Sequence, residues 1–253
     1  MIATKKVIDK DKLDIVMEDL RHLAFAEFFE EGDADFSAYD KSGMMVNIQN
    51  EMVALMERAL LFARHMEGRT AIDLTLRFME KLPETIQLLH SDVEAAFDGD
   101  PAAGSHAEII VAYPGLYTIS IQRFAHILYQ LGVPILPRLM TEMAHSRTGI
   151  DIHPGTVIGE RFFIDHGTGI VIGETAVIGD NVKLYQGVTL GAITTRKGQQ
   201  LRGTRRHPSV GNDVTIYANA TVLGGDTHIG SGSTLAGGAL VTESVPENSV
   251  VAA

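Results

Sequence analysis

The hydrophobic pattern of the chain changes abruptly near residue 150. Before that point apolar residues recur three and four apart in Glu51–Arg64 (EMVALMERALLFAR) and Ala71–Met79 (AIDLTLRFM), which predicts helices with one buried face. Gly115–Gln130 is more apolar and carries its polar positions on one side, so we expect a helix packed against another helix or subunit. Four prolines are expected at helix starts or breaks: Pro83, Pro114, Pro134 and Pro137. Residues 1–148 are therefore predicted to form a helical domain.

From Ile150 onward the chain repeats every six residues. An aliphatic residue occupies each repeat, and a glycine or another small residue often follows it. Neither a helix nor an amphipathic strand has this period, whereas a triangular solenoid with three six-residue sides per coil does. The aliphatic positions are Ile152, Ile158, Ile164, Ile172, Ile178, Leu184, Leu190, Val210, Ile216, Val222, Ile229, Leu235 and Val241. We predict a second domain, residues 149–253, of roughly four coils stacked at the ~4.8 Å spacing of paired strands.

The repeat is interrupted at three places. Extra residues at Gly169–Val171 and Asp226–His228 are expected to bulge from the coil. The long interruption, 191–209, is expected to leave the coil as an external loop. This loop carries five basic residues and no acid, although the whole chain has a net charge of −11. The loop is either a site for an anionic ligand or simply solvated, and the acidic remainder disfavours nucleic acid and anionic membranes.

Composition narrows the possible chemistry. The chain has no cysteine, which excludes disulfides, thiolate metal sites and cysteine nucleophiles. Its first residues are charged and no stretch reaches the ~18 apolar residues that span a bilayer, so we expect a cytoplasmic protein without a signal peptide. The acidic segment Glu27–Asp40 is expected to be a solvated loop.

His166 is the strongest candidate for a catalytic side chain. It lies in Ile164–Gly169 (IDHGTG), beside a carboxylate and at a repeat position where a small residue is usual. Asp151 precedes it by 15 residues, slightly less than one coil of about 18, so both are expected near one edge. This spacing favours a general base oriented by a carboxylate, with a purely structural histidine as the alternative. The pair Arg206-His207 closes the basic loop and is either a carboxylate or phosphate site or an exposed loop pair.

Several motifs together resemble one known family. They are Asp100-Pro101-Ala102, Asp151-Ile152-His153-Pro154, IDHGTGIVIGET at 164–175, QGVTLG at 186–191, and Arg206-His207-Pro208. From about Asp92 to Val245 the chain resembles the bacterial and plant serine O-acetyltransferases. The resemblance implies an α+β fold, in which a helical domain precedes a left-handed parallel β-helix. It also implies transfer of acetyl from acetyl-CoA to the hydroxyl of L-serine, the first step of cysteine biosynthesis.

The resemblance also implies roles for individual residues. His166 would remove the hydroxyl proton of serine, with Asp151 orienting its ring. Two pairs of side chains would hold the substrate ammonium and carboxylate, respectively Asp100 with Asp165 and Arg206 with His207. Acetyl-CoA would lie in a groove between subunits, near Gly191, Ala192, Ala218 and Gly237. No metal is implied.

The family also suggests partners. A homotrimer or a hexamer built as a dimer of trimers is implied, as is L-cysteine as a competitor at the serine site. The chain ends at Ala253, before the tail that engages O-acetylserine sulfhydrylase in the family, so we do not expect that complex. It departs from the family in the longer loop Ile193–Arg205 and in Ala192, where glycine is expected.

Three other functions remain open from the sequence. An acetyltransferase for a sugar or an antibiotic would use the same fold, but two acids and a base suit a zwitterionic amino acid better. A zinc lyase of the carbonic anhydrase type needs converging histidines, whereas His166, His207 and His228 are scattered. In a non-catalytic scaffold these residues would be plain surface.

Overall fold

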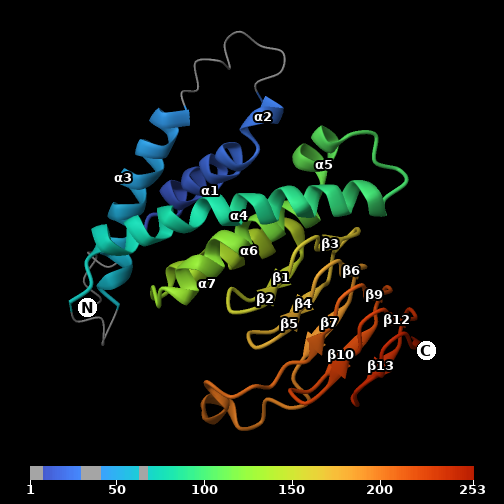
Figure 1. Cartoon of the computed structure of the whole chain (residues 1–253). Coiled ribbons are helices and arrows are strands. Elements are labelled where there is room, and N and C mark those ends of the chain that lie inside the picture. Colours follow the sequence, from blue (N-terminus) through green and yellow to red (C-terminus); the bar gives the residue numbers. More distant parts are fainter. Residues whose placement is uncertain (1–7, 30–40, 63–67) are drawn as a thin grey trace.

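A computed structural model describes residues 8–29, 41–62 and 68–253 (Figure 1). Within these ranges the first part of the chain is helical and the second forms a three-sided stack of short strands. The helices are α1 (Lys10–Ala24), α2 (Ala26–Phe29), α3 (Lys41–Leu60), α4 (Ala71–Gly99), α5 (His106–Ala112), α6 (Pro114–Gln130) and α7 (Leu136–Thr148). None of them is long and apolar enough to cross a membrane.

Helix α4 crosses the top of the strand stack and is longer than the sequence suggests (Figure 1). The Thr70 hydroxyl caps its start by accepting the Asp73 N–H at 3.1 Å. The expectation that Pro83 starts or breaks a helix is wrong, because α4 continues through it. Phe78 and Leu89, on either side of the proline, are both fully buried, so tertiary packing outweighs a local penalty of about 3 kcal/mol.

The predicted boundaries of the earlier helix also need correction. Helix α3 begins at Lys41, ten residues before the predicted start at Glu51, because the four-residue spacing of buried side chains extends back through Ile48 to Met44. Its predicted end lies in 63–67, outside the described residues. Most of the acidic segment Glu27–Asp40, expected to be a loop, also lies outside the described residues. Its first residues belong to helix α2.

The second part is the predicted left-handed parallel β-helix. Its strands are β1 (Asp151–Ile152), β2 (Val157–Ile158), β3 (Phe163–Ile164), β4 (Val171–Ile172), β5 (Val177–Ile178), β6 (Lys183–Leu184), β7 (Thr189–Gly191), β8 (Ser209–Val210), β9 (Thr215–Ile216), β10 (Thr221–Leu223), β11 (His228–Ile229), β12 (Thr234–Leu235), β13 (Leu240–Val241) and β14 (Val250–Val251). They form three parallel sheets: a first sheet β1-β4-β7-β10-β13, a second sheet β2-β5-β8-β11 and a third sheet β3-β6-β9-β12-β14. The solenoid thus has nearly five coils rather than roughly four, since the last coil lacks the regular spacing.

The six-residue pattern predicted the inward positions well. Twelve of the thirteen aliphatic residues are buried, and Ile158 is partly buried against the same core. The first coil has two extra residues between β3 and β4, as expected near Gly169. The loop 191–209 projects from the stack, drawn in orange in Figure 1, while β7 pairs with β10 and β5 with β8 behind it.

A buried ion pair joins the helices to the first coil. Arg123 on α6 donates to both carboxylate oxygens of Asp92 on α4, at 2.7 and 2.8 Å, and to the carbonyl of Gly159 at 2.7 Å. Asp92 also accepts the N–H of Phe162 at 2.9 Å. The polar side of α6 therefore packs against the solenoid of its own chain. Buried apolar side chains form one continuous core from the helices into the coils.

Candidate active site

Two edges of the triangular solenoid carry the candidate residues. We call the edge where the chain passes from the third sheet to the first the base corner, formed by 165–170, 185–188, 217–220 and 236–239. The edge where it passes from the first sheet to the second is the loop corner, formed by 153–156, 173–176, 192–208 and 224–227.

His166 projects from the base corner. Its backbone has a φ of 58°, in the left-handed region that few non-glycine residues adopt. The side chain is 71% exposed, and its Nε2 lies 3.7 Å from Oδ1 of Asp165. An exposed imidazole with a carboxylate at one nitrogen suits proton transfer to and from a bound molecule.

Asp100 reaches the same corner from the helical part. It caps the end of α4, and its carboxylate accepts the Tyr113 O–H at 2.6 Å and the Ala102 N–H at 2.9 Å. These hydrogen bonds lower the pKa of Asp100, with help from the nearby charge of Lys183. The same Asp100 contact raises the pKa of Tyr113 to about 12, so Tyr113 stays a donor and Asp100 stays an anion.

Lys183 connects these acidic groups, and its role was not visible in the sequence. Its Nζ donates to the Gly99 carbonyl at 2.7 Å and lies 3.5 Å from Oδ2 of Asp165. The ammonium group also lies over the rings of Phe163 and Tyr185, 4.8 and 4.7 Å from their centroids. This lysine therefore ties the end of α4 to the base corner.

Asp151 lies at the same edge, but it does not contact His166 in the described structure. It begins β1 opposite Val171 of β4, and its N–H donates to the Ile170 carbonyl at 2.9 Å. No hydrogen bond or ion pair joins the Asp151 carboxylate to His166 among the described residues. The expected placement at a shared edge holds, whereas the orienting contact stays a prediction.

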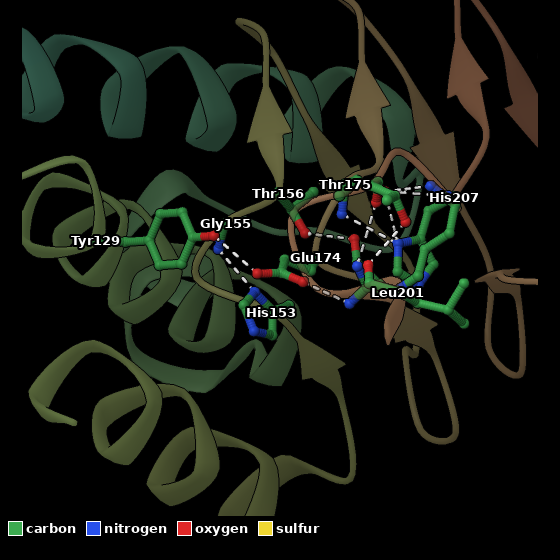
Figure 2. Close-up of polar contacts among 11 residues, drawn as sticks. Tyr129, His153, Gly155, Thr156, Glu174, Thr175, Leu201 and His207 are labelled. Carbon is green, nitrogen blue, oxygen red and sulfur yellow. Dashed lines mark hydrogen bonds and ion pairs between the residues drawn. The ribbon is translucent and has the colours of Figure 1, made fainter. Parts of the chain in front are cut away.

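Arg206 and His207 lie at the loop corner, on a different edge from His166. Arg206 forms an ion pair with Glu174, whose other carboxylate oxygen accepts the Tyr129 O–H at 2.9 Å (Figure 2). Although burial opposes it, the hydrogen bonds from Arg206 and Tyr129 hold the pKa of Glu174 below its usual value. A cavity of about 450 Å³ lies beside this ion pair and is lined by loop residues that include Arg202.

Two histidines at this corner are held in their neutral form. Burial, followed by the charge of Arg206, lowers the pKa of His207 to about 4, and its side chain packs over Gly173. Burial and the charge of Arg138 lower the pKa of His153 to about 4 as well. Neither ring is protonated at neutral pH, so neither adds positive charge to the corner.

The small residues assigned to acetyl-CoA divide between the two corners. Gly191 and Ala192 lie where the loop leaves β7, at the loop corner. Ala218 and Gly237 stack on the base corner below His166, where the N–H of Gly238 donates to the Ala218 carbonyl at 2.9 Å. Ala218 and Gly237 carry at most a methyl group, so the main chain can be approached at these two positions, beside the stacked rings of Tyr185 and Tyr217.

The described residues contain no group of three His, Cys, Asp or Glu able to hold a metal ion. His228 lies on β11, where its Nδ1 is 2.9 Å from the Ser209 hydroxyl oxygen. Within one chain the three histidines do not converge, since His166 lies at the base corner, His207 at the loop corner and His228 on β11.

A six-residue-repeat β-helix that exposes an imidazole beside carboxylates is the arrangement of the hexapeptide-repeat acyltransferases. No family model matches the chain. It is 44% identical to a plasmid-encoded serine acetyltransferase of Synechococcus elongatus over 259 aligned positions, covering 96% of this chain and 80% of that protein. The chain belongs to the serine acetyltransferase family.

Solved structures agree with this assignment. Serine acetyltransferase 1 of Entamoeba histolytica, crystallised in complex with L-cysteine, superposes with a TM-score of 0.82 at 36% identity, covering 93% of this chain and 85% of that one. A serine acetyltransferase in complex with CoA superposes with a TM-score of 0.63 at 27% identity, covering 94% of this chain and 96% of that one. Both similarities extend over the helices as well as the solenoid.

Proposed function

We propose that this enzyme transfers acetyl from acetyl-CoA to the hydroxyl of L-serine, with His166 as the general base. The observation that carries the residue roles is the cluster at the base corner, where Asp165 lies between His166 and Lys183 and where Asp100 is held as an anion. Two carboxylates next to an imidazole suit an acceptor that carries an ammonium group beside its hydroxyl. The enzyme is expected to work in the cytoplasm.

The complete site is proposed to lie between subunits of a homotrimer. Within one chain, Arg206 and His207 occupy the loop corner while His166 occupies the base corner, so one prism cannot bring them to one substrate. In a threefold ring the loop corner of each subunit faces the base corner of its neighbour. The neighbour's Arg206 and His207 would then hold the serine carboxylate, and acetyl-CoA would lie along the groove between the two corners.

The reaction follows from this arrangement. A serine hydroxyl is a weak nucleophile at neutral pH, so proton removal by His166 as the oxygen attacks the thioester carbon is proposed to contribute about 10²–10⁴-fold. Asp151, at the same edge, would orient the ring. Main-chain N–H groups of the corner would stabilise the oxyanion. As the C–S bond breaks, the imidazolium returns its proton to the CoA thiolate, so no covalent enzyme intermediate is needed.

The direct test is replacement of the base. His166→Ala is expected to lower turnover at least about 100-fold in a thiol-release assay with acetyl-CoA and L-serine, because this side chain is the proposed proton acceptor. The oligomer and its circular dichroism spectrum should not change, since the side chain is 71% exposed. Full activity of this variant would contradict the mechanism.

The same assay tests which acceptor the enzyme prefers and whether L-cysteine inhibits it. Serine is expected to react much faster than any sugar, which lacks the ammonium and carboxylate groups. It should also react faster than homoserine, whose extra methylene displaces the hydroxyl from His166. L-cysteine, which a relative binds in its crystal structure, is expected to compete with serine, since it offers the same ammonium and carboxylate. Equal rates with a sugar would favour a different acceptor.

A further inference from the structure

The loop corner contains a hydrogen-bonded arrangement that fixes both Arg206 and His207. Glu174 and Thr175 lie just after β4 in the second coil, separated from it by Gly173, while Arg206 and His207 lie at the end of the external loop in the third coil. Figure 2 shows Glu174 between Tyr129 and the loop, with Thr175 beside His207. The roles given so far to the site residues do not explain why Glu174 and Thr175 both face the end of the loop.

Thr175 organises this contact through a single oxygen. Its Oγ1 accepts the backbone N–H groups of Arg206 and His207, each at 3.0 Å, and lies 2.9 Å from Nδ1 of His207. A hydroxyl has two acceptor positions and one proton. Because both acceptor positions are used, its proton must point to Nδ1.

The backbone N–H of Thr175 also points to Nδ1 of His207, at 3.1 Å. An amide N–H can only donate, so Nδ1 must be unprotonated and the neutral ring carries its proton on Nε2. Protonation of Nδ1 would place its N–H against the backbone N–H of Thr175. This disfavours the charged ring, in keeping with the His207 pKa of about 4. No described residue accepts a hydrogen bond from Nε2, and His207 is only 8% exposed, so this donor is unsatisfied within the described chain.

Glu174 fixes the other member of the pair. It binds one terminal nitrogen of Arg206, while the other terminal nitrogen reaches the Thr204 carbonyl at 3.4 Å. A guanidinium has five N–H donors, so this arrangement limits its rotation and still leaves donors unused. The Tyr129 O–H holds Glu174 in place from α6.

We propose that Glu174 and Thr175 are positioning residues that present Arg206 and His207 as a preset pair of N–H donors for the substrate carboxylate. This inference rests on the proposed function, because it takes the carboxylate subsite as given. Donors that are already in place lose little conformational entropy when the substrate binds. Glu174 and Thr175 are therefore expected to increase the affinity for serine rather than the rate of the chemical step.

Steady-state kinetics of Thr175→Val and Thr175→Ser test the hydroxyl. Valine keeps the shape but removes both acceptor positions and the proton, so KM for serine is expected to rise about tenfold with kcat within about twofold. Serine at this position keeps the hydroxyl and should restore the wild-type KM. An unchanged KM in Thr175→Val, or an equal loss in Thr175→Ser, would overturn the proposal.

Glu174→Gln tests whether carboxylate recognition itself is affected. Ethanolamine is serine without its carboxylate, so the ratio of kcat/KM for serine over ethanolamine measures this subsite alone. The ratio is expected to fall about tenfold in Glu174→Gln, because Arg206 loses its charged partner. A ratio equal to that of the wild type would show that Glu174 only supports the fold.

A measurement independent of activity separates this inference from the function. In enzyme labelled with ¹⁵N-histidine, His207 is expected to show an unprotonated Nδ1 and a protonated Nε2 at neutral pH, with His207→Asn identifying its signals. A protonated Nδ1 would overturn the inference even if serine is acetylated. Absence of serine acetylation by the wild type would instead overturn the proposed function, whatever the tautomer.

Discussion

Individual residues in this protein show how burial sets the chemistry of histidine. His166 is exposed and next to a carboxylate, whereas His153 and His207 are held neutral by their surroundings. The sequence context pointed to His166 through its glycine-rich corner and its upstream aspartate. Thr175 ends the motif at 164–175, but neither it nor Lys183 had a predicted role, because their partners lie far away in sequence and depend on the stacking of coils.

His153 predicts a specific dependence of stability on pH. Its pKa is about 4 in the folded chain and near 6.5 when unfolded. The contribution of the neutral ring to the free energy of unfolding is therefore complete above pH 6.5 and decreases as the pH falls toward 4. His153→Asn keeps an acceptor for the Gly155 N–H, which the Nδ1 of His153 accepts at 2.9 Å, but cannot titrate. The free energy of unfolding, from urea titrations at pH 7.5 and 5, should therefore decrease less in this variant than in the wild type. An equal decrease in both proteins would contradict the assignment.

At the scale of elements, the close approach of α6 to the first coil positions the base corner. The start of α6 touches the main chain of β3, immediately before Asp165 and His166. The apolar pattern predicted this helix well. It did not show that the polar side of the helix would be buried, because the partner of Arg123 is Asp92, 31 residues away. Long-range ion pairs of this kind leave no periodic pattern in a single sequence.

Gly115 on α6 provides a test of this contact. A Cβ added there would lie 2.5 Å from the carbonyl oxygen of Ile164, a backbone atom that cannot rotate away. Gly115→Ala is expected to destabilise the protein by about 1–3 kcal/mol in urea unfolding and to raise KM for serine, since Asp165 would shift. Gly104→Ala is the matched control, because its new methyl meets only the flexible end of Glu108. Equal effects of both substitutions would argue against the role given to Gly115.

At the scale of the whole molecule, the candidate residues are divided between two edges of one prism. The six-residue period predicted the three-sided solenoid, its inward residues and its external loop. The period also indicates where in its coil each residue lies. His166 lies two residues after an inward position that ends the third side, whereas His207 lies three residues before one in the second sheet. Counting these positions across the external loop would have placed His166 and His207 at different corners. It could not have shown how neighbouring chains meet.

Mixed oligomers test whether the site lies between subunits. If each site takes His166 from one chain and Arg206 from the next, random mixing of equal amounts of His166→Ala and Arg206→Ala chains should restore about a quarter of the sites. Refolding the two inactive proteins together and measuring thiol release provides the readout. A mixture of Asp165→Ala and His166→Ala should stay inactive, because both defects lie at the same corner. No recovery in the first mixture would contradict a shared site.

The closure of the solenoid behind the loop 191–209 has a consequence for how such enzymes diversify. The strands on either side of the excursion are already paired with neighbouring coils, so the framework does not depend on the length of the segment. Each doubling of a flexible segment costs only about 0.6 kcal/mol in closure entropy. This position can therefore accept foreign peptides, either through evolution or as a grafting point for an engineered sensor, provided that the final three residues before β8 are kept.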